Sequence, residues 1–236
     1  MAARGRATVS AGVRRAAASS RTSRTTPPRK HRASSPEGER LPIQILPLAP
    51  ERWRDFTLLF GAKGACAGCW CTWARLTHAQ FRAATPEQRR AHTRRVVNAG
   101  DPPGLLAYEG DAPVGWVALA PRTDYPRLAT SRVLAPVDDA EVWSVSCFFV
   151  AKTHRRRGLT VRMLEAACDF AAQRGARMLE GYPIDTKGAR QAATFLWTGL
   201  PAAFAAAGFR EVARRSPTRP IMRRAVRPGR KAGARG

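Results

Sequence analysis

The segment between Val150 and Thr160 holds the clearest chemistry in the sequence. It contains three consecutive arginines at 155–157 followed by Gly158, and it lies between an apolar run and a helical pattern. The first amides of a helix have no partner within it and carry a partial positive charge, so they bind anions. Because glycine has no Cβ, a phosphate can approach the backbone closely at this point. The segment therefore predicts a phosphate site, and a solvated basic turn is the alternative.

A second candidate for chemistry is a cysteine cluster, Cys66-x-x-Cys69-x-Cys71, with His78 and His92 nearby. A structural zinc site uses four ligands, often as two separated pairs, and the sequence has no second pair. We therefore expect no metal, and a Cys-rich metal-binding module stays an alternative. The chain has 5 cysteines. An odd number without a secretory signal indicates reduced thiols and a cytoplasmic protein.

These candidates are positioned by alternating strand and helix patterns. Strands are expected at 42–48, 105–108, 114–120, 142–150, 176–182, 209–212 and 219–222, and helices at 50–60, 85–100, 161–175 and 201–207. The pair 105–120 has Gly110 in its turn and is typical of a hairpin. A strand, helix, strand crossover within an otherwise antiparallel array predicts an α/β fold, with a mixed, mostly antiparallel twisted sheet flanked by helices.

Charge divides the 236-residue chain into three parts. Residues 1–40 carry ten basic and two acidic residues, and residues 214–236 carry nine basic residues and no acid. All six tryptophans and nine phenylalanines lie between these ends. We therefore expect a globular domain at 41–222 between disordered basic tails at 1–40 and 223–236.

The formal net charge of +24 raises the question of whether the protein binds nucleic acid. The tails could bind it nonspecifically by releasing counterions, but they have no aromatic residues for base stacking. A basic nucleic-acid-binding protein is the other alternative. We expect no membrane segment, because no apolar run approaches the roughly 18 residues that a membrane-spanning helix needs. The expected state is a monomer or a homodimer.

The run Arg155-Arg156-Arg157-Gly158-Leu159-Thr160 resembles the R/Q-x-x-G-x-G/A element of the GNAT N-acetyltransferase superfamily. The strand before it, the helix after it, the hairpin at 105–120 and the later Phe204-Ala-Ala-Ala-Gly-Phe209 stand where that family has them. The resemblance spans about residues 42–222. It implies the GNAT (acyl-CoA N-acyltransferase) fold, and an N-acetyltransferase that uses acetyl-CoA as co-substrate.

The resemblance also implies site residues. Backbone amides of the loop would wrap the pyrophosphate of coenzyme A, and a bulge in the preceding strand would leave backbone groups for the pantetheine arm. The cofactor-binding residues implied in this way are Phe148, Phe149, Val150, Arg155, Arg156, Arg157, Gly158, Leu159 and Thr160. The acceptor would be a small-molecule or peptide amine that attacks the thioester directly, in a pocket lined by Trp70, Trp73 and the cysteines. Packing of these thiols and tryptophans under a loop is the alternative.

Two positions depart from the family pattern. Thr160 replaces Gly or Ala at the last loop position, and Phe204 stands where many members have a tyrosine that acts as general acid. Tyr182 is the substitute acid that we expect, although a thiol with a pKa near 8.5 can also leave as thiolate. Glu141, at the start of the strand before the loop, is the expected general base.

Overall fold

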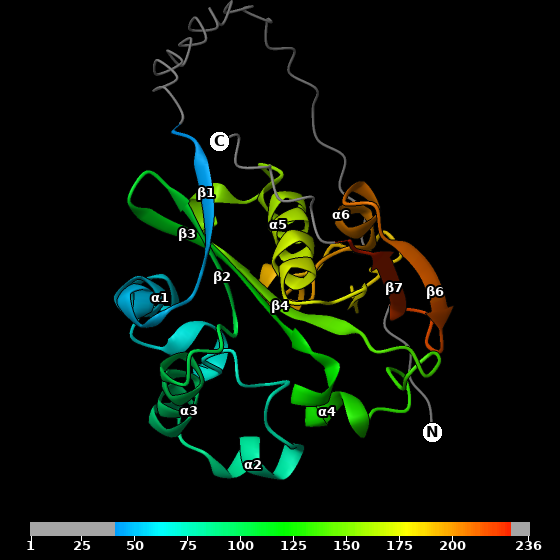
Figure 1. Cartoon of the computed structure of the whole chain (residues 1–236), viewed down its shortest axis with the longest axis horizontal. Helices are drawn as coiled ribbons and strands as arrows, with labels where there is room; N and C mark the ends of the chain where they lie inside the picture. The colour runs from blue at the N-terminus through cyan, green and yellow to red at the C-terminus, as the bar shows by residue number, and fades with distance from the viewer. Residues whose placement is uncertain (1–40, 228–236) are drawn as a thin grey trace, which may run out of the picture. The chain divides into compact units, whose positions relative to one another are not determined.

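The computed structural model describes residues 41–227, and they contain a seven-stranded sheet with the order β1-β2-β3-β4-β5-β7-β6 (Figure 1). Its strands are β1 (Ile43–Pro47), β2 (Gly104–Glu109), β3 (Ala112–Pro121), β4 (Trp143–Val150), β5 (Met178–Gly181), β6 (Arg210–Arg214) and β7 (Pro220–Ala225). Only β4 and β5 pair in parallel, and the other neighbours are antiparallel. The predicted mixed, mostly antiparallel sheet is confirmed.

The helices are α1 (Trp53–Phe60), α2 (His78–Ala83), α3 (Pro86–Asn98), α4 (Pro126–Ala129), α5 (Leu159–Gln173) and α6 (Pro201–Ala206). The helix expected at 85–100 corresponds to α3, which begins with a capping box in which Thr85 and Gln88 exchange side-chain to backbone hydrogen bonds. Sequence analysis missed α2 and α4. Helix α2 buries none of its residues, so it has no apolar stripe that a periodicity search could detect.

Each face of the sheet carries its own core. On one face α5 and α6 pack against alternate strand residues, which on β3 include Val117 and Leu119. On the opposite face α1 and the loop after it pack against Trp116 and Ala118. Figure 1 shows α5 and α6 on one side of the strands, with α1 and α3 on the other. The period-two alternation of buried residues therefore gives the sheet two apolar faces.

Strand β4 contains a bulge at Ser146. Its register with β3 pairs Cys147 with Ala118 and Val145 with Leu119, so Ser146 has no residue opposite it. Strand β4 pairs with β5 only as far as Val145, opposite Gly181, and then continues to Val150 paired with β3 alone. A bulge bends and twists its strand, and here it coincides with the point where the two parallel strands part.

The structure moves the expected C-terminal boundary of the domain. Strand β7 continues to Ala225, three residues past the boundary expected at 222. Arg223, the first residue of the disordered tail expected at 223–236, is instead buried between Glu180 and Asp138. Residues 1–40 and 228–236, where the rest of both tails was expected, lie outside the described residues. Between 41 and 227, no helix is long and apolar enough to cross a membrane.

Candidate active site

The loop between β4 and α5 forms a turn with free backbone amides. Arg156 and Gly158 have positive φ angles of 62° and 74°, and α5 begins directly after Gly158. Within residues 41–227, no acceptor takes a hydrogen bond from the amides of 155–160. A Cβ built on Gly158 meets no atom within 4 Å, so the space above it is open. Amides that converge at a helix start in this way form an anion site.

The side chains of this loop have different roles. Arg157 donates to one oxygen of Glu109 at 2.6 Å, and His154 contacts the other oxygen at 2.7 Å. These two hydrogen bonds lower the pKa of Glu109 below its ordinary value. Arg155 donates to the carbonyl of Val150 at 3.1 Å. Glu109 at the end of β2 therefore fixes one side of the loop.

The other predicted loop residues act through backbone or packing. The side chain of Arg156 is exposed, whereas Leu159 is buried in the core under Gly115. The residue that caps α5 is Gly158, which has no side chain that could bond to the first amides of the helix. The predicted loop residues thus lie together around one turn.

Beyond the bulge, alternate amides of β4 face the gap beside β5. The amide of Ala151 donates to Val114 on β3, so in this ladder the amide of Phe149 also points to β3, and those of Phe148 and Val150 point away from it. The amide of Phe148 donates to the carbonyl of Trp197 at 2.6 Å. Of the three backbone positions that we expected to be free, two are therefore engaged, and Val150 alone offers an open amide.

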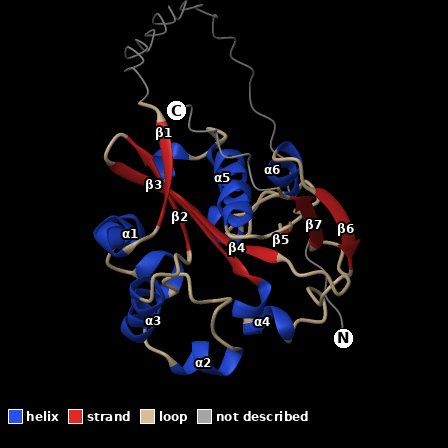
Figure 2. Ribbon diagram, in the orientation of Figure 1, coloured by secondary structure: helices blue, strands red, loops and turns tan. Residues whose placement is uncertain are grey.

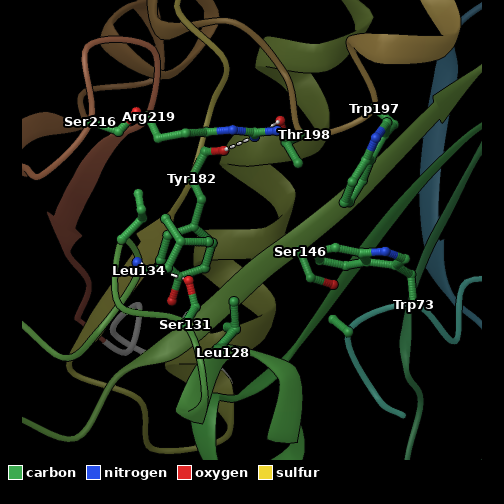
Figure 3. A pocket seen from close by; sticks show the side chains of 12 residues that line it. Trp73, Leu128, Ser131, Leu134, Ser146, Tyr182, Trp197, Thr198, Ser216 and Arg219 are labelled. Atoms are coloured by element: carbon green, nitrogen blue, oxygen red, sulfur yellow. Dashed lines mark hydrogen bonds between the residues drawn. The ribbon is translucent and has the colours of Figure 1, made fainter. Parts of the chain in front are cut away.

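A cavity of about 250 Å³ lies where β4 and β5 part (Figure 3). Trp73 and Trp197 line one side of it, with ring centroids 4.7 Å apart in an edge-to-face arrangement. Arg219 reaches across another side. The remaining lining residues are small, apolar or hydroxyl-bearing: Ala74, Leu128, Ser131, Val133, Leu134, Ser146, Tyr182, Thr198 and Ser216. The bulge residue therefore forms part of the cavity wall.

Behind the cavity lies a buried polar network centred on Glu180, whose side chain is fully buried. Its two oxygens accept hydrogen bonds from Arg122 at 2.9 Å and Arg223 at 2.6 Å. The hydroxyl of Tyr182 donates to the same carboxylate at 2.6 Å and contacts Ser144 at 2.7 Å. The network anchors β5 to β4, β7 and the segment after β3.

The two predicted catalytic residues are not brought together. Glu141 is exposed and does not line the cavity. Tyr182 does line it, but burial and the nearby charge of Glu180 raise the pKa of its hydroxyl well above the ordinary value. A hydroxyl held in this way is a poor proton donor near neutral pH. The structure therefore gives Tyr182 a structural contact rather than a free acidic proton.

The cysteine loop packs against the second core. Cys71 accepts a hydrogen bond from the indole of Trp116 at 3.0 Å, and hydrogen bonding from Cys147 lowers the pKa of its thiol. Trp70, expected in the acceptor pocket, is buried between α1 and α3. Trp73 lines the cavity, whereas none of the cysteines is among its lining residues. Among the residues that the structure describes, no three His, Cys, Asp or Glu side chains could hold a metal ion.

Sequence reasoning missed Arg219 and Trp197 as parts of the site. Arg219 stands in a short Ser-Pro-Thr-Arg-Pro turn that indicates only a strand connection. Trp197 belongs to the stretch between β5 and α6, which is mostly loop (Figure 2). The one signal in the sequence that could have pointed to Trp197 was an aromatic residue in a loop, two positions before Gly199.

The sequence model of the acetyltransferase (GNAT) family matches residues 70–194, which include β2 to β5 and the loop before α5. A comparison with curated proteins gave no match.

Among solved structures, the chain is similar to an acetyltransferase from Thermus thermophilus, with 20% identity, a TM-score of 0.44, and coverage of 79% of this chain and 98% of that one. It is also similar to a GCN5-related N-acetyltransferase from Kribbella flavida, with 18% identity, a TM-score of 0.46, and coverage of 78% and 98%. The GNAT domain of S. lividans PAT has 15% identity, a TM-score of 0.48, and coverage of 78% and 90%. With the family model matching more than half of the sequence, this chain belongs to the acetyltransferase (GNAT) family.

Proposed function

We propose that this protein transfers an acetyl group from acetyl-CoA to a primary amine. The observation that carries the proposal is the arrangement along β4. The strand places its bulge residue, Ser146, in the cavity wall and leads directly into the free amides of 155–160. Val150 lies four positions after Ser146, which is about 13 Å along an extended strand. An elongated donor with a diphosphate at one end and a thioester at the other fits this layout.

The loop fits a diphosphate by its donors as well as its shape. The amides of 155–160 would hold the phosphate oxygens, and the exposed side chain of Arg156 adds a positive charge. The open amide of Val150 would pair with the arm of the donor. The donor supplies an activated acetyl group, and the chain supplies orientation next to the cavity.

The reaction proposed is a direct transfer. The amine nitrogen forms a bond to the acetyl carbon, the carbon–sulfur bond breaks, and the sulfur leaves with the electron pair. The nitrogen releases one proton to water as the amide forms. Because a thiol has a pKa near 8.5, the sulfur can leave as thiolate without a dedicated acid. Departure as thiolate suits a site that offers no free tyrosine hydroxyl at these two positions. Phe204 is buried in the core, and the hydroxyl of Tyr182 donates to Glu180.

Thermal unfolding with acetyl-CoA tests the proposal. At about 100 times the dissociation constant, binding adds roughly 2.7 kcal/mol to the free energy of unfolding. Gly158→Glu places a bulky negative charge at the free amides and is expected to abolish this stabilisation.

Gly175→Glu is the matched control. Gly175 lies just beyond the other end of α5, also has a positive φ (83°), and also has open space around it. Both variants therefore introduce the same charge and a similar backbone strain. The control is expected to keep the full acetyl-CoA effect. No stabilisation of the wild type, or equal loss in both variants, would overturn the proposal.

A further inference from the structure

Arg219 is a half-buried cation without a carboxylate partner in the described part of the chain. Its guanidinium donates to the hydroxyl of Thr198 at 3.0 Å and to the carbonyl of Tyr182 at 3.4 Å, both of which are neutral (Figure 3). Burial lowers its pKa. By contrast, Arg122 and Arg223 behind the cavity each pair with Glu180. A cation withdrawn from water is stabilised by an anion, and Arg219 faces a cavity that could receive one.

The rest of the cavity offers a complementary apolar surface. Trp73 and Trp197 present aromatic rings, and Leu128, Val133 and Leu134 present aliphatic groups. Arg219 is the one charged residue among the twelve that line the cavity. Amines with several positive charges would meet a like charge and no carboxylate here. The lining therefore favours a ligand with an anionic group and an apolar body.

The lining also restricts the kind of amine. No His, Asp, Glu or Lys lines the cavity, so no side chain there can take a proton from an ammonium group at neutral pH. The acceptor must arrive with its amine uncharged. The α-amine of an amino acid is a weaker base than a lysine side chain, whose pKa is about 10.4, so a larger share of it is uncharged near neutral pH. An α-amine therefore suits this cavity better than a side-chain amine.

Resting on the acetyl transfer proposed above, we infer that the acceptor is a small α-amino compound with a carboxylate and an apolar side chain. Its carboxylate binds the guanidinium of Arg219, and its side chain packs against Trp73 and Trp197. Its amine then lies toward Ser146, next to the acetyl group. Arg219 is thus a specificity-determining residue of the site.

The test compares free amino acids with their amides as acceptors. The panel contains alanine, valine, leucine, methionine, phenylalanine and tryptophan, each also as the carboxamide, with spermine and Nα-acetyl-lysine as cationic competitors. Thiol release from acetyl-CoA gives kcat/KM for each. The amides are weaker bases and hence less protonated, so they would react faster if the carboxylate played no part. We expect at least one free amino acid to exceed its amide by about 10- to 100-fold, the range of a charge-assisted hydrogen-bonded pair.

Arg219→Gln is expected to remove that preference, and Arg219→Lys to keep part of it. Arg210→Gln removes a charge from the exposed strand β6 and is the matched control, with the preference unchanged. Dividing the amino acid to amide ratio of each variant by that of the wild type cancels the difference in amine basicity between the two acceptors. A merely structural role of Arg219 would lower both rates equally.

The two proposals can fail separately. If acetyl-CoA does not stabilise the wild type, the acetyl transfer itself fails. If acetyl-CoA stabilises both the wild type and Arg219→Gln, but amides or cationic amines are preferred or no amino acid reacts, the inference about the acceptor is overturned.

Discussion

The carbonyl of Trp197 accepts a hydrogen bond from the amide of Phe148, at 2.6 Å, where β4 has parted from β5. The loop between β5 and α6 thereby takes the place of a neighbouring strand for one residue. The same tryptophan contributes its ring to the cavity. Trp197 thus contacts the part of β4 along which we place the acetyl donor, and it also forms part of the wall of the proposed acceptor cavity.

Binding of acetyl-CoA is expected to exchange this bond. The arm of the donor would lie along β4 and compete with Trp197 for the amide of Phe148, so the segment 183–199 loosens while the loop at 150–162 becomes ordered. Hydrogen–deuterium exchange followed by mass spectrometry checks both changes. Peptides from 183–199 should exchange faster with acetyl-CoA, and peptides from 150–162 more slowly. Slower exchange in both segments would show that the bond to Trp197 is kept.

The network around Glu180 is expected to control stability. Glu180→Gln removes the buried charge that Arg122 and Arg223 share, and breaking a buried ion pair on one side costs about 3–5 kcal/mol. Tyr182→Phe removes one hydroxyl from the same network and should cost about 1–3 kcal/mol. Urea unfolding measures both. Equal losses of unfolding free energy in the two variants would contradict the conclusion that the Glu180 carboxylate holds the network together.

Tyr182→Phe also tests the role in proton transfer that the sequence predicted. Because its hydroxyl donates to Glu180, we expect kcat of the phenylalanine variant to stay within about threefold of the wild type, well below the roughly 10²-fold or greater effect of removing a general acid. A loss of kcat of that larger size, with a changed pH profile, would show that Tyr182 acts as the general acid.

The pair of contacts on Glu109 predicts a dependence of stability on pH. The pKa of this carboxyl is lowered in the folded protein, so its contribution is fully present above the ordinary carboxyl pKa and is lost as the pH falls through the folded value. Glu109→Gln should therefore reduce the decline in Tm below about pH 5. Asp111→Asn, which removes a carboxylate from the same turn, is the control and should leave the wild-type decline in place. Identical profiles for the wild type and Glu109→Gln would refute this role.

Thiol reactivity should distinguish the cysteines. Cys66 is exposed, whereas burial raises the pKa of Cys69 and Cys168 to about 11. A chromogenic disulfide reagent should therefore react fastest with Cys66, because the thiolate is the reactive form and access limits the others. The fast phase should vanish in Cys66→Ser and persist in Cys168→Ser. Loss of the fast phase when Zn²⁺ is added would instead favour the metal-binding alternative.

Much of the fold could be predicted, because its signals are local. The helix α5 buries Leu164, Cys168 and Ala171 on the stripe that the sequence shows, and each predicted strand corresponds to an observed one. The loop before α5 was predictable for the same reason, since Gly158 and the adjacent arginines are contiguous in the sequence.

The cavity was harder to predict because its walls come from distant parts of the chain. Trp73, Ser146 and Arg219 meet only through the order of strands in the sheet, and no local pattern specifies which long-range pairs form. Glu141 was selected for its position before β4, yet the side chain faces solvent at the far end of that strand. Position in the sequence therefore identified a carboxylate next to β4, but Glu141 does not lie at the cavity.

The bulge at Ser146 changes which positions of β4 face α5. Before it, Trp143 and Val145 pack on that side, and after it Phe148 and Val150 do, so odd positions give way to even ones. Deleting Ser146 would restore strict alternation while every apolar side chain kept its face and its partner on β3. The shortened chain would then have an unbroken strand and an intact core without the bend that separates β4 from β5. We therefore expect the deletion to keep the sheet and to remove the gap beside β5 in which we place the acetyl donor.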